Sequence, residues 1–297
     1  VDLDIAEKPR FEYTFHSPRG PEKWGHISEQ YKTCAVGNRQ SPVDVRFSSY
    51  FPKLKNVIVD PSMPSLEVRM PPMPPTKVIN NGHSILVDVP GDGDAANKGS
   101  LVFNSSSGSG GGGGRHLADF VFHQFHIHVP GEHEVNGKPA DMAIHLVFAR
   151  TSQAPVAAEQ ANFTTAEARF SIIEVPFDVR PQGESFLDLL VDRLPQPPPL
   201  GAKTPQSTVD PQALPLDFQD ALFGQKGADV ARLASSEFYT YSGSATTPPC
   251  HEDVRWFIMK RILGISQSQL QRLAQVCRKR ATRGRRRIID GARPQLS

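Results

Sequence analysis

The chain has 297 residues with 33 basic and 31 acidic side chains, so its formal net charge is only +2. This near balance excludes a strong overall field for nucleic acid, and no nucleic-acid partner is expected. No apolar run is long enough to span a bilayer and no signal-peptide pattern begins the chain, so we expect any targeting segment to have been removed. The length suits one β-rich domain covering residues 1–297.

Short runs rich in β-branched and aromatic residues alternate with turn signals along the chain, which predicts a mostly β (α+β) domain. The expected strands are residues 57–59, 77–79, 85–89, 101–103, 121–128, 144–148, 170–175 and 254–259. Helical patterns are fewer, and the best are residues 184–191 and 266–277. Ser266 and Gln269 have the spacing of a capping box at the start of the second helix.

Two segments have the composition of surface insertions. Residues 104–115 are rich in serine and glycine, which is typical of a flexible loop. Residues 196–230 begin within a proline-rich run, and proline cannot donate the hydrogen bonds of a sheet. We assign no function to either insertion.

Six of the ten histidines lie between His116 and His145. His126 and His128 are two residues apart on an expected strand, so both imidazoles leave the same face. An Asn-Gly turn at residues 136–137 follows, after which the chain returns as a strand that could bring His145 opposite the first two. Three imidazoles with an open fourth position are typical of catalytic zinc, whereas packed or solvent-facing histidines are the alternative interpretation.

Distant motifs favour the metal site. Residues 239–250 read Tyr-Thr-Tyr-Ser-Gly-Ser-Ala-Thr-Thr-Pro-Pro-Cys, residues 39–45 read Arg-Gln-Ser-Pro-Val-Asp-Val, and residues 80–83 read Asn-Asn-Gly-His. With the histidine stretch, these motifs resemble the α-class carbonic anhydrases, in the family's order, from about Tyr13 to Gln295. The resemblance implies a central, mostly antiparallel twisted β-sheet with peripheral helices. It also implies reversible hydration of carbon dioxide to bicarbonate and a proton, by attack of zinc-bound hydroxide.

The resemblance assigns the metal ligands first. His126, His128 and His145 match the residues that hold Zn²⁺ in the family. Gln124, two residues before His126 on the same strand, matches the side chain that orients that imidazole.

The resemblance assigns the catalytic roles next. Thr246 matches the threonine that orients the zinc-bound hydroxide, and Glu132 matches the carboxylate that takes the threonine's own proton, with direct metal ligation as an alternative. His83 matches the proton shuttle, a task for which imidazole titrates in a suitable range, although a histidine after Asn-Gly is otherwise a turn residue.

Carbon dioxide is apolar and needs a dry patch beside the metal. The residues that match this pocket are Val147, Ala245, Val254, Trp256 and Thr247, with Ile172 or Ile173 completing it. Taken one at a time, these residues are indistinguishable from ordinary core residues. Ala245 stands where the family usually has leucine, and the isoleucine is larger than the usual valine.

Three positions depart from the family pattern. Ala143 stands where a glutamate accepts a hydrogen bond from His145, and a methyl group cannot accept one. Asp141 lies too far along the strand to take this role, so a water or another side chain must substitute. We therefore expect zinc to leave this protein faster than it leaves family members that retain the glutamate. Glu174 replaces a glycine, and the sequence leaves open which way it faces. Gly291 replaces an asparagine that supports a ligand through its main chain.

The resemblance pairs Cys34 with Cys250 in a disulfide, as in secreted or lumenal members, and leaves Cys277 single. Sequons at Asn104 and Asn162 are compatible with a secretory route. We therefore expect an oxidising compartment: secreted, periplasmic or an organelle lumen.

Residues 278–287 carry the strongest charge feature, a run of arginine and lysine. A solvated loop is the simpler interpretation, and a docking site for an acidic protein or an anionic membrane surface is the alternative.

Two other classes of protein fit part of the pattern. A catalytically weak or silent carbonic-anhydrase-like binding protein would usually lack one of the three histidines. A cupin would use Glu132 as a ligand after His126 and His128, but the chain has no second cupin motif and this fold would not explain residues 246–249.

Overall fold

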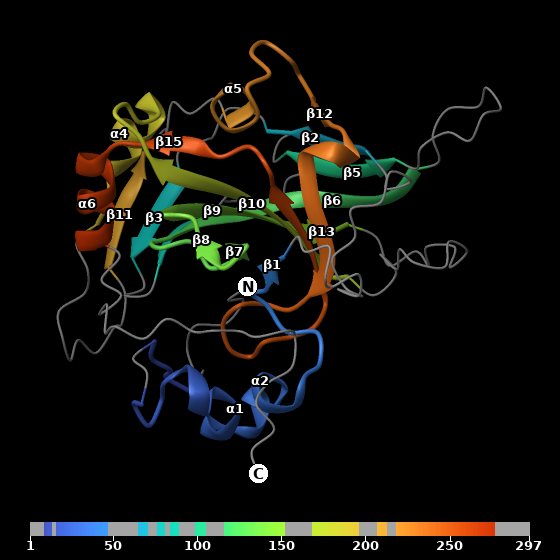
Figure 1. Cartoon of the computed structure of the whole chain (residues 1–297), viewed down its shortest axis with the longest axis vertical. Helices are drawn as coiled ribbons and strands as arrows, with labels where there is room; N and C mark the ends of the chain where they lie inside the picture. Colours follow the sequence, from blue (N-terminus) through green and yellow to red (C-terminus); the bar gives the residue numbers. More distant parts are fainter. Residues whose placement is uncertain are drawn as a thin grey trace.

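Figure 1 shows a computed structural model of the chain, which describes residues 9–13, 16–46, 65–70, 76–80, 84–88, 99–104, 116–151, 168–195, 207–212 and 218–276. The expected strand at 57–59 and the sequon at Asn162 lie outside the described residues. No helix among the described residues is both long and apolar enough to cross a membrane.

Most of the described strands belong to one 12-stranded sheet. They are β2 (Ser65–Arg69), β3 (Thr76–Asn80), β4 (Ile85–Asp88), β5 (Ser100–Asn104), β6 (His116–His128), β9 (Met142–Arg150), β10 (Phe170–Val179), β11 (Ser207–Gln212), β12 (Ala231–Leu233), β13 (Phe238–Gly243), β14 (Val254–Met259) and β15 (Leu263–Ile265). A separate three-stranded sheet joins β1 (Asp44–Val45), β7 (Glu134–Val135) and β8 (Lys138–Pro139).

The long path of the large sheet runs in the order β11, β3, β4, β6, β9, β10, β14, β13. Strands β5, β2 and β12 continue from β6, and β15 pairs with β10. Among the described strands of this sheet, neighbours are antiparallel except where β10 meets β14 and β15. The predicted mostly antiparallel sheet is confirmed.

The helices that the structure describes lie around the sheet (Figure 1). They are α1 (Trp24–Ile27), α2 (Thr33–Val36), α4 (Ser185–Val191), α5 (Phe218–Phe223) and α6 (Gln267–Val276), with 3-10 helices η1 (Pro21–Lys23), η2 (Glu29–Tyr31) and η3 (Ser235–Glu237). At the start of α6, the Gln269 amide donates to Ser266 Oγ at 3.2 Å, and the Ser266 amide donates to Gln269 Oε1 at 2.9 Å. This reciprocal pair is the predicted capping box.

The alternation of side chains along β6 separates the main core from the functional face. Phe125 and Ile127 are fully buried in a large, phenylalanine-rich core, so Gln124, His126 and His128 point to the opposite face. Helix α5 covers the core face, where the Phe218 ring packs edge-on against Phe125 at 5.1 Å. One strand therefore contributes both to the hydrophobic core and to the candidate site.

The Asn-Gly turn forms as predicted. Asn136 and Gly137 have φ of 54° and 78°, the left-handed values that a tight hairpin turn between β7 and β8 requires. After this hairpin the chain enters β9, which pairs antiparallel with β6 and sets His145 directly opposite His126.

The described part of the 196–230 segment contains β11 and α5. β11 pairs with β3 at an end of the sheet's long path. Residues 105–115, 196–206 and 213–217 lie outside the described part of the chain, and the two insertions remain predictions.

Candidate metal centre

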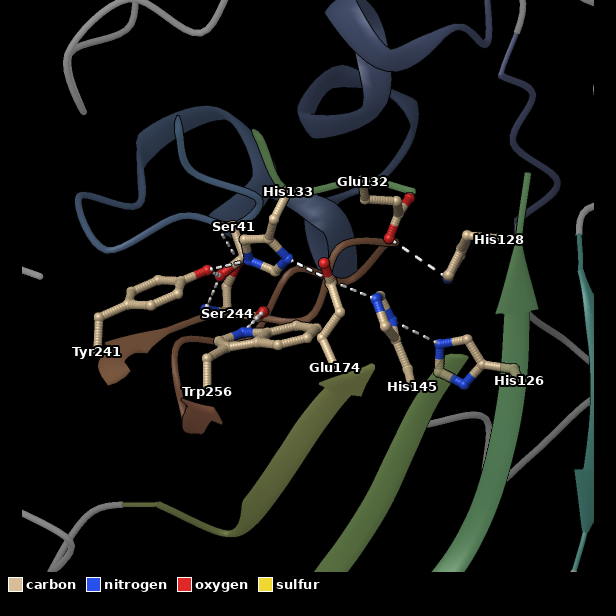
Figure 2. A network of polar contacts seen from close by, with 10 residues as sticks. All are labelled: Ser41, His126, His128, Glu132, His133, His145, Glu174, Tyr241, Ser244 and Trp256. Atoms are coloured by element: carbon tan, nitrogen blue, oxygen red, sulfur yellow. Dashed lines mark hydrogen bonds and ion pairs between the residues drawn. The ribbon is translucent and has the colours of Figure 1, made fainter. Parts of the chain in front are cut away.

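His126, His128 and His145 converge on one point between β6 and β9 (Figure 2). One nitrogen from each ring lies within 4.8 Å of the other two, and His126 Nε2 is 3.2 Å from His145 Nδ1. His128 and His145 are almost fully buried, at 2% and 0% exposure. The strand pairing has therefore brought together the three residues that the sequence predicted would share a face.

The outer nitrogens of two of these rings are held by acceptors. Gln124 Oε1 lies 3.0 Å from His126 Nδ1, and Glu174 Oε2 lies 2.7 Å from His145 Nε2. An amide oxygen and a carboxylate oxygen can only accept, so each ring carries its proton on the outer nitrogen. When both rings are neutral, as metal-binding imidazoles are, the inner nitrogens His126 Nε2 and His145 Nδ1 carry the lone pairs and face each other.

This arrangement fits a metal cation. Two neutral ring nitrogens 3.2 Å apart repel through their lone pairs unless a proton or a metal ion lies between them. Zinc–nitrogen bonds of about 2.0–2.1 Å at tetrahedral angles place ligand nitrogens about 3.3 Å apart. The His126–His145 pair thus has the spacing that zinc requires, and His128 brings a third ring nitrogen to within 4.8 Å of both.

Glu174 is the residue whose direction the sequence left open, and it faces the histidines. It lies directly opposite His145 in the pairing of β10 with β9, and it is only 2% exposed. Its Oε2 also lies 2.5 Å from His133 Nδ1, so one carboxylate oxygen serves two imidazoles. Burial by itself would raise the pKa of Glu174, but the charge of His133 and the hydrogen bonds from both rings outweigh burial and hold this pKa well below its ordinary value.

The partner of His145 is therefore Glu174. The sequence predicted only that a water or another side chain would replace the missing glutamate at 143. Because Glu174 fills that role, the physical reason for expecting fast zinc loss no longer holds. Asp141 is engaged elsewhere, since its Oδ2 accepts the Val179 amide at 2.8 Å. Ala143 is fully buried and lies opposite His128. The sequence contained a signal for this partner. It departs from the family pattern at two positions, losing a carboxylate at Ala143 and gaining one at Glu174, and the two strands that carry them are neighbours.

The contacts continue from His133 to the opposite side of the site (Figure 2). His133 Nε2 is 2.7 Å from the Tyr241 hydroxyl, which donates to Ser41 Oγ at 2.7 Å. Burial raises the pKa of Tyr241 well above its ordinary value, so the phenol stays protonated. Ser41 in turn accepts the amide of Ser244, which begins the loop that carries Thr246. Both serines lie in motifs of the sequence, but the sequence predicts no role for either.

The loop at residues 244–250 is fixed at both ends. The predicted disulfide between Cys34 and Cys250 is present, with the two Cα atoms 5.1 Å apart. Near the other end, Trp256 Nε1 donates to the Ser244 carbonyl at 3.0 Å. Thr246 is only 9% exposed within this loop.

Glu132 lies beside the candidate ligand His128. Its Oε2 is 3.3 Å from His128 Nε2, and its side chain is only 10% exposed. This places a carboxylate close to the ligand cluster, and the predicted contact with Thr246 stays a prediction.

Four of the predicted apolar residues gather on the same face as the histidines. Val147, Ile172, Val254 and Trp256 form one buried cluster. Ile172 pairs with Val147 on β9 and with Trp256 on β14, whereas Ile173 faces the main core, which decides between the two isoleucines. The ring of Trp256 is 5.0 Å from that of His145, so the cluster adjoins the candidate ligands.

Ala245 and Thr247 are partly exposed in the 244–250 loop, where Ala245 donates its amide to the His251 carbonyl at 3.0 Å. Their pocket role remains a prediction. His83, Cys277, Gly291 and the basic residues 278–287 lie outside the described residues.

Comparison with known proteins identifies the family. The family model for eukaryotic-type carbonic anhydrases matches residues 19–297. Alpha carbonic anhydrase 4 of Arabidopsis thaliana is 28% identical over 273 residues, covering 92% of this chain and 79% of that protein. Dioscorin dioA3 of Dioscorea japonica is 26% identical over 285 residues, covering 96% of this chain and 81% of that protein.

A solved structure agrees. The α-carbonic anhydrase of Thermovibrio ammonificans, in complex with the inhibitor sulfanilamide, superposes with a TM-score of 0.64 at 25% identity, covering 91% of this chain and 92% of that one. Fold, histidine cluster and sequence motifs lead to one conclusion: the chain belongs to the eukaryotic-type carbonic anhydrase family.

Proposed function

We propose that this protein is a zinc-dependent carbonic anhydrase, a lyase that hydrates carbon dioxide reversibly to bicarbonate and a proton. The observation that carries the proposal is the convergence of three imidazoles, with the outer nitrogens of His126 and His145 held by Gln124 and Glu174. The three imidazoles would hold Zn²⁺ and leave a fourth position open.

Zinc in this site would supply a Lewis acid that makes water a nucleophile near neutral pH. The chain's own residues would do the rest. The hydroxyl of Thr246 would orient the nucleophile and donate its own hydrogen bond to the Glu132 carboxylate. The near-complete burial of Thr246 and the closeness of Glu132 to His128 support these roles.

The apolar cluster would receive carbon dioxide. Val147 follows His145 by two residues on β9, so both side chains point to the same face. Val254 and Trp256 extend that face on β14, with Ala245 and Thr247 beside them in the loop. An apolar substrate gains by leaving water for such a surface, whereas bicarbonate, being charged, does not.

Turnover also needs a group that carries a proton away, and we assign this to His83. An imidazole suits this task because its unperturbed pKa lies close to neutral pH.

The disulfide supports an oxidising compartment, which we propose is extracellular, periplasmic or an organelle lumen. The basic segment 278–287 remains a candidate contact for an acidic protein or a membrane surface.

One experiment tests the function. Zinc content and carbon dioxide hydration are measured on the same preparation, with a sulfonamide titrated as inhibitor. We expect one zinc per chain, activity that disappears at one inhibitor per zinc, and loss of both zinc and activity in His128→Asn. The matched control is His251→Asn, at an exposed histidine. Full zinc occupancy without hydration would favour a carbonic-anhydrase-like binding protein, and absence of zinc would refute the metal site.

A further inference from the structure

We propose that Glu174 is the positioning residue for the metal ligand His145. The alanine at 143 and the glutamate at 174 are then two linked departures from the family pattern, here called the coupled exchange. In this exchange the supporting carboxylate has moved from the ligand's own strand to the neighbouring strand. This rests on the proposed zinc site.

The geometry of the two strands allows the exchange. Residues two apart on one strand share a face, and so do residues directly opposite each other on paired strands. By this geometry, residue 143 on β9 and residue 174 on β10 are both same-face neighbours of His145. Here the first is a methyl group and the second is a glutamate.

The contacts show that Glu174 holds His145 firmly. The carboxylate oxygen lies 2.7 Å from His145 Nε2, in a site where both residues are at most 2% exposed. The bond fixes the proton on Nε2, which leaves Nδ1 free to bind metal, and it fixes the plane of the ring. Because the oxygen also contacts His133, which is itself held by Tyr241, the carboxylate cannot swing away without breaking several contacts.

Ala143 is fully buried beside Gly131. Gly131 lies so close that a methyl group at that position would come 3.4 Å from the Ala143 Cβ. A glutamate added at 143 would enter this packed region and face Glu174 across His145. Two carboxylates competing for one N–H repel each other, so Ala143→Glu is expected to help only when Glu174 is removed.

The test is a double-mutant cycle on the full chain. Zinc release to a chelator is followed at one pH for the wild type, Glu174→Ala, Ala143→Glu and the double variant. Removing the partner of a metal-bound imidazole typically costs tenfold to a hundredfold in metal affinity or activity, a range measured in part on carbonic anhydrase itself. We expect Glu174→Ala to release zinc faster by that factor, Ala143→Glu to release it no more slowly than the wild type, and the double variant to return to within about threefold of the wild-type rate.

Two further variants separate positioning from general stability. Glu174→Gln keeps the shape and an acceptor oxygen but not the charge, so its release rate should lie between those of the wild type and Glu174→Ala. Glu29→Ala removes a glutamate that is 87% exposed and should change nothing. A purely structural role would lower the melting temperatures of the zinc-loaded and zinc-free proteins equally. A positioning role lowers that of the zinc-loaded protein more.

The outcomes distinguish this inference from the proposed function. Wild-type protein that holds no zinc overturns both. Zinc that leaves wild type and Glu174→Ala at equal rates, or a double variant no slower than Glu174→Ala, overturns the coupled exchange alone. Two zinc ions per chain would also overturn it, because His133, His145 and Glu174 would then bind an ion of their own.

Discussion

Ser41 and Ser244 each accept the other's backbone amide: the Ser41 N–H donates to Ser244 Oγ at 2.9 Å, and the Ser244 N–H donates to Ser41 Oγ at 2.9 Å. Both residues are buried, at 6% and 0% exposure. This reciprocal pair joins the N-terminal segment to the loop that carries Thr246, across 203 positions of sequence.

The first prediction follows from this pair. Ser41→Ala removes the acceptor for the Ser244 amide and for the Tyr241 hydroxyl, leaving two buried donors. An unsatisfied buried donor costs about 1–3 kcal/mol, so we expect the free energy of unfolding to fall by at least this amount. Urea unfolding followed by tryptophan fluorescence measures it. Ser236→Ala, at an exposed serine, should stay within about 0.5 kcal/mol of the wild type. A similar change in both variants would contradict the prediction.

The second prediction concerns the disulfide. Cys34 and Cys250 close a loop with a sequence separation of 216, for which the chain-entropy estimate is about 5 kcal/mol before any native strain. We expect the double variant Cys34→Ser, Cys250→Ser to lose several kcal/mol of stability and to hydrate carbon dioxide more slowly, because the bond anchors the Thr246 loop.

Thiol counting checks the premise of this prediction. With three cysteines and two of them in the disulfide, the denatured, unreduced wild type should show one free thiol, that is 3 − 2 = 1. Three free thiols would refute the pairing. Equal unfolding midpoints with and without reductant would refute its contribution to stability.

The third prediction concerns metal removal. A ligand that binds only the folded protein stabilises it by about 4 kcal/mol when its free concentration is a thousand times the dissociation constant. Stripping zinc with a chelator should therefore lower the melting temperature, and adding zinc back should restore it in the wild type. His145→Ala should show no such recovery. If zinc-free and zinc-loaded wild type melt together, the histidine cluster does not bind zinc in the folded state.

The fourth prediction concerns His83. If this imidazole carries the proton away, His83→Ala should slow carbon dioxide hydration in weak buffer, and added imidazole should restore the rate. His251→Ala is the control, at an exposed histidine in a described loop. Unchanged hydration by His83→Ala in weak buffer would assign the proton transfer to another group.

The sequence by itself determined the local features. The period of two along a strand placed His126 and His128 on one face, and the Asn136-Gly137 turn returned the chain as a strand carrying His145. The capping box of Ser266 and Gln269 was also readable, because capping depends on residues three apart. Family motifs supplied the pairing of Cys34 with Cys250, which spacing cannot decide.

The tertiary structure alone decided which side chains meet across strands that are distant in the sequence. Alternation shows that Ile172 and Ile173 face opposite sides but not which side is the core, and only the register of β10 against β9 and β14 settles it. The same register turns Glu174 toward His145. Ser41 and Ser244 likewise meet only after folding. Register is set by the packing of the whole sheet, so it cannot be read from a residue's neighbours in the sequence.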